Sequence, residues 1–227
     1  VLSTGYAYKA GNTYQPNLSD DLGTGGDMDL ATALGIDNNR LKDATFIEFD
    51  FVAASTEVTF RYLFASKEYD PVYQFPCRIT DGFALLLKKA SDPTYTNLAV
   101  LPGGAGPVSV TNIHPNIPGG NSPGCPAKNE TYFAGINTAH IETNFDGRTI
   151  PLTSKANVIP GETYHFKIVL ADYDDSSFDS AVFFEAGSFD IGVKILDGAG
   201  AQLPASINVC DNAPQVFTAS VQATNAT

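Results

Sequence analysis

Apolar and polar residues alternate with a period of two in several segments, and this alternation constrains the fold more than any other feature of the sequence. Ile47, Phe49 and Phe51 share one side of such a segment, whereas Glu48 and Asp50 occupy the other side. Successive side chains of a β-strand point to opposite faces of a sheet, so the pattern predicts a strand with one buried face.

Other segments show the same pattern or a related one. Residues 58–65 and 164–170 also alternate, and the apolar run over 81–87 suits a strand that is buried on both faces. Residues 181–195 predict one long strand or two, with a bulge or bend at Gly187. Long strands separated by loops predict an all-β fold, a two-sheet β-sandwich of the jelly-roll type.

Helix signals are weak in this sequence. The best candidate is a single turn over residues 30–34, because Asp27 and Asp29 just before it are suited to capping its first turn. The segments between the predicted strands are rich in glycine and proline, which favour turns.

The sequence carries 25 acidic and 13 basic residues, a formal net charge of -12 at pH 7. A surface of that sign repels phosphates and anionic lipid headgroups, so we expect no nucleic-acid partner. No apolar run approaches the roughly 18 residues of a membrane-spanning helix, so we expect no membrane insertion. The acidic surplus favours divalent cations, although solubility alone would also explain it.

Three cysteines are present, Cys77, Cys125 and Cys210, and none forms a C-x-x-C metal-binding pair. Residues 102–126 are packed with Gly, Pro, Asn and Ser, which predicts a long excursion on the surface. A disulfide between Cys77 and Cys125 would pin this excursion and leave Cys210 unpaired. The alternative is that both thiols remain reduced.

The pattern changes at Leu203, where a new β-domain is predicted to begin. A short strand over 207–210 is followed by an alternating segment over 217–222. We therefore divide the chain into a β-sandwich domain over 1–202 and the first strands of a second β-sandwich domain over 203–227.

The densest acidic segment follows the predicted strand over 164–170. Its acidic residues are Asp172, Asp174, Asp175, Asp179 and Glu185. Closely spaced carboxylates repel one another unless a cation neutralises them, and Ca²⁺ takes about six to eight oxygen ligands. The segment therefore predicts a calcium site without the spacing of an EF-hand loop. A solvated turn is the alternative.

A second acidic group lies on strand faces and strand ends. Its members are Glu48, Asp50, Glu68 and Asp81. Buried carboxylates need a cation or N–H donors, so these four are further candidate metal ligands. A salt bridge to Arg61 or a turn cap is the alternative reading. A third group in a Gly-rich stretch predicts turn caps, namely Asp20, Asp21, Asp27 and Asp29.

Signals for catalysis are poor, and we expect no enzyme. Residues 120–124 match the text of the G-x-S-x-G motif, but they lie in a proline-rich loop rather than in a strand–turn–helix. His114, His140 and His165 show no paired metal spacing. A glycosidase would need two carboxylates that face each other across a cleft, which the sequence alone does not test.

Several tyrosines occur in predicted loops, where they suit either stacking on sugar rings or a structural place in the core or in a turn. They are Tyr6, Tyr8, Tyr14, Tyr69 and Tyr73. The second role is the expected one.

Four ordered motifs resemble the choice-of-anchor L domain family. Residues 44–51 resemble its LEFDF strand, and residues 58–69 resemble its FRYVFASEEY signature. Residues 80–87 are similar to its NDVFGFFL segment. Residues 164–172 and 179–189 match the pattern YHIKLAIAD…YDSGVFLEAGSF.

The resemblance implies a module of large secreted proteins, found chiefly in Bacteroidetes that use type IX secretion, with gliding-motility adhesins among its hosts. Immunoglobulin-like or PKD-like repeats often follow this module, which suits residues 203–227. Lys67 stands where the family has Glu, which would weaken a cation site there or replace it with a salt bridge. Residues 1–5 resemble a motif that lies deeper inside the family, so one or two N-terminal strands are expected to be missing or supplied elsewhere.

The expected function is that of a cell-surface adhesin module within a larger multidomain protein, stabilised by Ca²⁺ and binding polysaccharide or another surface ligand. A structural spacer in a long surface fibre is the main alternative, and a polysaccharide-degrading enzyme is the third. Exposed aromatic residues gathered on one face would favour binding, whereas a uniformly polar surface would favour the spacer.

Overall fold

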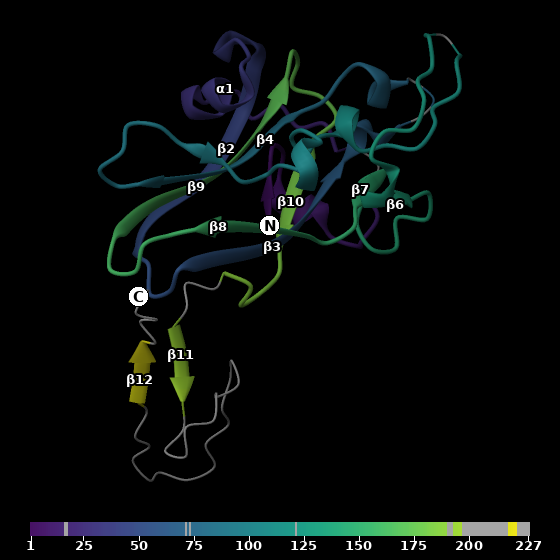
Figure 1. The fold of residues 1–227 in the computed structure, drawn as a ribbon. Coiled ribbons are helices and arrows are strands. Elements are labelled where there is room, and N and C mark those ends of the chain that lie inside the picture. The colour runs from purple at the N-terminus through teal and green to yellow at the C-terminus, as the bar shows by residue number, and fades with distance from the viewer. Residues whose placement is uncertain are drawn as a thin grey trace.

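The computed structural model describes residues 1–15, 18–70, 72, 74–120, 122–189, 193–196 and 218–221. Two antiparallel sheets lie one above the other in Figure 1, and their inward-facing side chains form one apolar core. Aromatic contacts join the layers, as between Phe60 and Phe166, whose ring centroids are 5.4 Å apart. The predicted all-β, two-sheet sandwich is confirmed.

The first sheet has six strands in the order β1-β10-β3-β7-β6, with β8 also paired to β3. Its strands are β1 (Leu2–Ser3), β3 (Glu57–Ser66), β6 (Phe133–Ile136), β7 (Gly147–Thr149), β8 (Leu152–Asn157) and β10 (Ser180–Phe184). Along β3 the side chains of Val58, Phe60, Tyr62 and Phe64 are buried on the face that the alternating pattern predicts, and Ala65 and Ser66 at the end of the strand are buried as well.

The second sheet has the order β2-β9-β4-β5. Its strands are β2 (Leu41–Val52), β4 (Gly82–Lys89), β5 (Thr96–Asn97) and β9 (Thr163–Tyr173). The helix α1 (Met28–Leu34) covers the outer face, where Leu30 packs with Leu86 and Val169. Residues 82–87 are therefore buried on both faces, which confirms the prediction from their unbroken apolar run.

The helix α1 is bounded by local signals in its own sequence. The Asp27 carboxylate accepts a hydrogen bond from the Leu30 N–H at 2.9 Å, and Gly35 ends the helix with a φ of 67°. The predicted helical turn and its cap are confirmed. Seven short 3-10 helices are also described: η1 (Ala7–Ala10), η2 (Asn38–Arg40), η3 (Lys67–Tyr69), η4 (Phe75–Cys77), η5 (Pro102–Gly104), η6 (Val110–Asn112) and η7 (Glu130–Tyr132).

The segment predicted as one long strand or two is resolved as two. β10 ends at Phe184, and Gly187 turns the chain with a φ of 72°. The strand β11 (Val193–Leu196) then pairs with β12 (Thr218–Val221) in a two-stranded sheet.

The predicted second domain falls largely on residues that the structure does not describe. Residues 203–217 and 222–227, with Cys210 among them, lie outside the described ranges. The division of the chain at residue 202 therefore remains a prediction.

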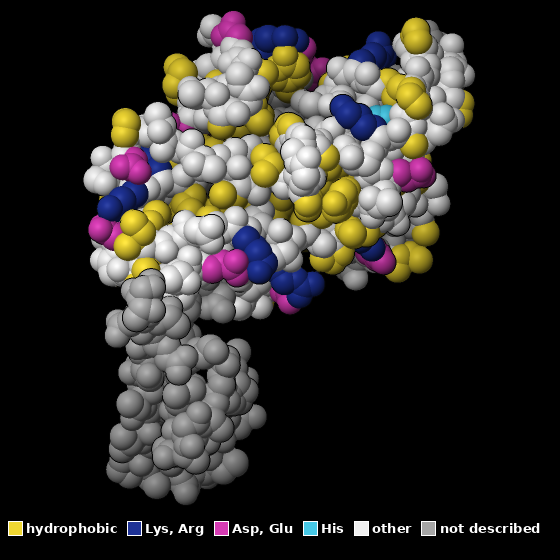
Figure 2. All heavy atoms as spheres, viewed as in Figure 1, with side chains coloured by type: hydrophobic (Ala, Val, Ile, Leu, Met, Phe, Trp, Pro, Cys, Tyr) yellow, Lys and Arg dark blue, Asp and Glu magenta, His cyan; other side chains and the backbone are white. Residues whose placement is uncertain are grey.

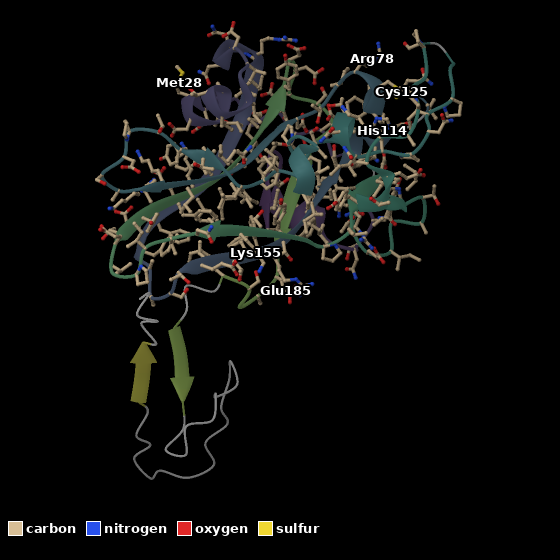
Figure 3. All side chains as sticks on the ribbon, viewed as in Figure 1. Met28, Arg78, His114, Cys125, Lys155 and Glu185 are labelled. Atoms are coloured by element: carbon tan, nitrogen blue, oxygen red, sulfur yellow. A yellow bond between two sulfur atoms is a disulfide. The ribbon has the colours of Figure 1, made fainter. Side chains whose placement is uncertain are left out.

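The long excursion over 102–126 is pinned in two ways. Cys77 and Cys125 form a disulfide that closes a separation of 48 residues, which confirms the predicted pairing. His114 and Cys125 lie in the same lobe of the molecule (Figure 3), where the His114 Nε2 is 4.0 Å from the Cys125 Sγ. The buried Asn112 side chain adds hydrogen bonds to two carbonyl groups of the excursion, both at 2.8 Å.

We predict that the double substitution C77S/C125S lowers the free energy of unfolding by roughly 2–4 kcal/mol, because a cross-link across a loop of this length restricts the unfolded chain. Urea denaturation followed by circular dichroism would measure the loss. Reduction of the unsubstituted chain with dithiothreitol should produce the same loss. Unchanged unfolding in both experiments would mean that hydrogen bonds such as those of Asn112 hold the excursion without the cross-link.

Candidate functional site

Five acidic side chains are buried together at one end of the sandwich. We refer to Asp43, Glu68, Asp81, Asp172 and Asp179 as the acidic cluster, and their exposed fractions are 1%, 2%, 2%, 0% and 1%. Acidic residues are almost never buried to this extent without a partner. The cluster is therefore the first candidate for a functional site.

The strand ladders bring these residues together from distant parts of the sequence. Asp81 comes directly before β4 and Asp172 lies near the end of β9, and the first residue pair of the β4–β9 ladder lies beside both. Asp179 comes directly before β10, and its carbonyl accepts a hydrogen bond from the Lys67 N–H at 3.0 Å. That contact places Asp179 next to η3, the short helix that carries Glu68.

Part of the cluster is satisfied by hydrogen bonds. The Glu68 Oε2 accepts a bond from the Asp81 N–H at 2.9 Å. The Asp81 Oδ1 accepts one from the Tyr173 N–H at 3.3 Å, and its Oδ2 accepts one from the Ser180 hydroxyl at 2.5 Å. Glu68 and Asp81 are thus held in place by the backbone and by one hydroxyl group.

Other oxygens of the cluster are buried without a hydrogen-bond partner. They are both carboxylate oxygens of Asp172, the Oδ2 of Asp179 and the Oδ2 of Asp43. The Oδ1 atoms of Asp179 and Asp43 accept bonds from the N–H groups of Asp20 and Thr24, at 2.9 Å and 3.0 Å. An unsatisfied buried oxygen costs roughly 1–3 kcal/mol, more when it is charged. Four such atoms in one place call for a proton or a cation.

Burial raises the pKa of every cluster member for which a shift is resolved. Loss of solvent raises the pKa of Asp172 to about 10, and the nearby Asp81 charge adds to this rise. The Thr4 side chain opposes the rise in the Asp172 pKa, although neither Asp172 oxygen has a hydrogen-bond partner. The pKa of Glu68 rises to about 8, again first through burial and then through the charge of Asp172, while the Asp81 N–H opposes the rise.

The two remaining shifts have the same origin. Burial raises the pKa of Asp81 well above its ordinary value, and the charge of Glu68 contributes further. Burial raises the pKa of Asp179 to about 6, while the hydrogen bond from Asp20 and the charge of Lys9 oppose the rise. The acidic residues thus raise one another's pKa, as expected for like charges in a space with little water.

Gly5 has no side chain, and the Asp179 carboxylate occupies the space where one would lie. A Cβ atom added at Gly5 would lie 2.0 Å from the Asp179 Oδ2, closer than any two such atoms approach. Any side chain at position 5 would therefore displace this carboxylate. The N-terminal segment and the acidic cluster are fitted to each other at this point.

The donor atoms of the cluster suit a hard divalent cation, because all of them are oxygens. Within the described residues, no ion pair links the cluster to a lysine or arginine. The same residues contain no group of three or more acidic, histidine or cysteine side chains already arranged around one metal position. A bound cation would therefore require side chains of the cluster to move.

A cavity of about 240 Å³ borders the cluster at Asp81. Its walls are mostly apolar and include Leu34, Ile36 and Val108, with Tyr173 also on the lining. The cavity therefore lies beside the cluster, while the Asp81 side chain itself is only 2% exposed.

The remaining predicted ligands of the first acidic group lie on the surface. Asp174 forms an ion pair with Arg40 at 2.5 Å, and the Asp175 carboxylate accepts a bond from the Ser177 N–H at 2.8 Å. Glu185 is paired with Arg61 at 2.7 Å. Arg61, which we considered as a salt-bridge partner for the second acidic group, thus pairs with a member of the first group.

Glu48 and Asp50, from the second group, lie on the outer face of β2. The His165 Nδ1 is 2.7 Å from Asp50, and its Nε2 is 3.7 Å from Glu48. Beside them the buried Lys167 ammonium contacts Asp27 at 2.7 Å and Asp29 at 2.8 Å. Glu48 and Asp50 thus contact His165 on the outer face of β2 and are not part of the acidic cluster.

The acidic cluster combines parts of two groups that the sequence analysis kept separate. Asp172 and Asp179 come from the first predicted group, and Glu68 and Asp81 come from the second. Asp43 belongs to neither group: it stands between Lys42 and Ala44 without another acidic residue beside it, and its positive φ of 48° is not visible in the sequence. Lys67 forms a salt bridge with Asp146 at 2.6 Å, the second of the two outcomes expected for its departure from the family pattern.

The segments that suggested catalysis do not form a catalytic arrangement among the described residues. Residues 120 and 122–124, the described part of this motif, lie in a loop rather than at the end of a strand. His114 is buried, and its Nδ1 lies 2.8 Å from the Pro115 carbonyl. No helix in the described ranges has the length and apolar character needed to cross a membrane.

We predict that, without divalent cations, the protein becomes less stable as the pH is raised from about 5 to about 9. In the folded state Glu68 keeps its proton up to a pKa of about 8 and Asp172 up to about 10, whereas carboxyls in an unfolded chain lose theirs near pH ~4. The folded state therefore binds more protons across this interval, and raising the pH favours unfolding.

Urea titrations at several pH values would measure this decline. The variant Asp172→Asn removes one titrating group and should flatten it, whereas Asp174→Asn on the surface should leave it unchanged. An equal decline in all three proteins would show that the cluster does not govern the pH dependence.

A family model described as the Choice-of-anchor L domain matches residues 1–190 of the chain. The match covers both sheets of the sandwich, α1 and every member of the acidic cluster. No curated protein and no solved structure matches the chain.

Proposed function

The chain belongs to the choice-of-anchor L domain family, a family of surface-associated proteins, and on this premise we propose that it is a calcium-stabilised, non-catalytic binding module. Its place would be within a larger secreted or cell-surface protein. Its role would be adhesion to polysaccharide or another surface ligand, with the bound ion holding the loops around the ligand site in place.

The unsatisfied oxygens of the acidic cluster carry the calcium part of the proposal. Asp172 is completely buried with neither oxygen bonded, and Asp179 and Asp43 each contribute one more free oxygen. A cation would satisfy these atoms and neutralise their repulsion at the same time. Calcium fits better than zinc, since the cluster contains no histidine or cysteine, and it tolerates irregular oxygen ligand sets better than magnesium does.

Protons compete with the cation for the same oxygens. The raised pKa values of Glu68 and Asp172 mean that, at neutral pH without metal, the cluster retains protons. Calcium binding would displace them, so the affinity for calcium should increase with pH. Extracellular modules of this kind bind calcium with dissociation constants of roughly 0.1–1 mM.

The distribution of surface residues favours a binding module over an inert spacer. Tyr6, Tyr8 and Tyr14 are exposed on the N-terminal segment, at 51%, 76% and 62%, whereas Tyr69 is buried and Tyr73 lies outside the described residues. On the face shown in Figure 2, Lys and Arg lie among Asp and Glu, with hydrophobic side chains scattered between them. Aromatic exposure is therefore concentrated rather than uniform, as the adhesion reading requires.

The burial of the acidic cluster supports a non-catalytic role. A glycosidase needs two carboxylates that reach the scissile bond from either side. Each carboxylate of the cluster is at most 2% exposed, so none can touch a polymer.

We predict that 10 mM CaCl₂ raises the melting temperature by roughly 3–10 °C relative to EDTA. Binding to the folded state with the affinity given above contributes about 1–3 kcal/mol, and for a domain of this size each kcal/mol corresponds to roughly 2–4 °C. Thermal unfolding at pH 7.5 followed by circular dichroism would measure the shift. Isothermal titration calorimetry in two buffers of different ionisation enthalpy would detect the released protons.

Matched aspartate variants locate the ion. Asp172→Asn and Asp179→Asn should abolish the calcium shift, and Asp172→Asn should also raise the stability in EDTA by about 1 kcal/mol, because it removes one buried acid. Asp174→Asn, which changes an exposed aspartate of the same loop, should retain the full shift. No shift in the unsubstituted protein, or a shift lost only in Asp174→Asn, would overturn the calcium proposal.

A further inference from the structure

The N-terminal segment presents three exposed tyrosine rings, Tyr6, Tyr8 and Tyr14. Tyr6 and Tyr8 are stacked, with ring centroids 5.7 Å apart and an interplanar angle of 29°. Tyr14 lies against the half-buried His140 of the loop between β6 and β7, with centroids 5.3 Å apart and an interplanar angle of 54°. Large rings are normally withdrawn from water, so three exposed rings on one short segment suggest a surface built to be covered by a ligand.

One buried side chain fixes the backbone beneath both pairs. Asn144 is 1% exposed, and its amide donates to the Lys9 carbonyl at 2.6 Å and to the Thr13 carbonyl at 2.7 Å. Its Oδ1 accepts a bond from the Gln15 N–H at 3.2 Å. The two pairs are therefore joined through a single amide group, and their positions do not depend on ligand binding.

The same segment is tied to the acidic cluster. The Asp20 N–H donates to the Asp179 Oδ1 at 2.9 Å, and the Asp20 carboxylate accepts bonds from the Tyr6 N–H at 3.4 Å and the Lys9 ammonium at 2.5 Å. Gly5, next to Tyr6, packs directly against Asp179. A change in the position of Asp179 is therefore transmitted to the first ring pair through Asp20 and Gly5.

The chemistry around the rings selects a neutral saccharide. Tyrosine faces carry negative π-density, which attracts the polarised C–H groups on the flat side of a sugar ring, and hydroxyl tips on the rings suit a hydroxylated ligand. The charge of Lys9 is balanced by Asp20, and the chain as a whole carries -12. An acidic polymer would thus find no unbalanced cation here. A protein partner would require an interface core poor in charge, which this ion pair interrupts.

We propose that Tyr6, Tyr8, Tyr14 and His140 form a stacking platform for a neutral polysaccharide, with Asn144 as a positioning residue. The acidic cluster supports the platform through Asp20, so occupation of the cluster by a cation strengthens saccharide binding. This inference rests on the proposed adhesive function and names the surface and ligand class of that function.

Affinity electrophoresis of the full chain tests the platform. Native gels would contain a soluble β-glucan, a mannan or a xylan, with alginate as the acidic comparison. We expect at least one neutral polymer to slow migration, and we expect Tyr8→Ala and Tyr14→Ala each to weaken that retardation at least tenfold. Phe46→Ala, which removes a ring that is 50% exposed on β2, is the matched control and should have no effect.

The outcomes separate the platform from the calcium proposal. Asn144→Ala should weaken binding, whereas Asn144→Gln, which keeps both the amide donor and the acceptor, should recover part of it; melting curves would establish that each variant is folded. Tyrosine-dependent retardation that is the same in calcium and EDTA supports the platform and overturns its link to the acidic cluster. Three outcomes overturn the platform, even where the calcium shift in melting temperature is observed. They are retardation by alginate alone, retardation that survives both tyrosine substitutions, and no retardation with any neutral polymer.

Discussion

Backbone pairing at the ends of β4, β9 and β10 determines where the acidic residues of this protein meet. The ladders place Asp81 beside Asp172 and bring Asp179 next to the short helix that carries Glu68. None of these carboxylates is buried by its own preference, because ionised groups favour water. The strand register holds them there, supported by the apolar core between the sheets, which resists separation of the layers.

The position of the acidic cluster implies that stability has been exchanged for responsiveness. Apolar residues of similar volume would pack at least as well in its place, since buried charges are costly even when they are paired. Under the calcium proposal, the cluster would exchange its protons for a cation, and the two states would differ in charge. A module that acts outside the cell would meet more calcium there than in the cytoplasm. The cation-bound, more stable structure would then form where the proposed module acts.

Sequence reasoning predicted the local features well and the long-range ones incompletely. Alternation identified the strands around Phe49, Phe60 and Phe166 because side-chain direction in a strand depends on position alone. The acidic residues were predicted as ligands in two groups, because sequence proximity was the available guide and nothing in it shows that Asp81 lies beside Asp172. Asp43 carried no signal at all. The sequence did not show which of the listed tyrosines are exposed, because the exposure of Tyr6, Tyr8 and Tyr14 depends on how Asn144 joins two loops that are far apart in the sequence.

The antiparallel pairing of β1 with β10 has a mechanical consequence. Leu2 lies opposite Val182 and Ser3 opposite Ala181, so the start of β1 and the C-terminal end of β10 lie at the same end of the ladder. A force that pulls on both ends of the sandwich would separate these strands one residue pair at a time rather than shear them together. Behind that short ladder lies the contact between Gly5 and Asp179. Under the calcium proposal, a cation bound by Asp179 would resist the force once the β1–β10 ladder has separated. Bound calcium would then raise the force that the module withstands before it unfolds.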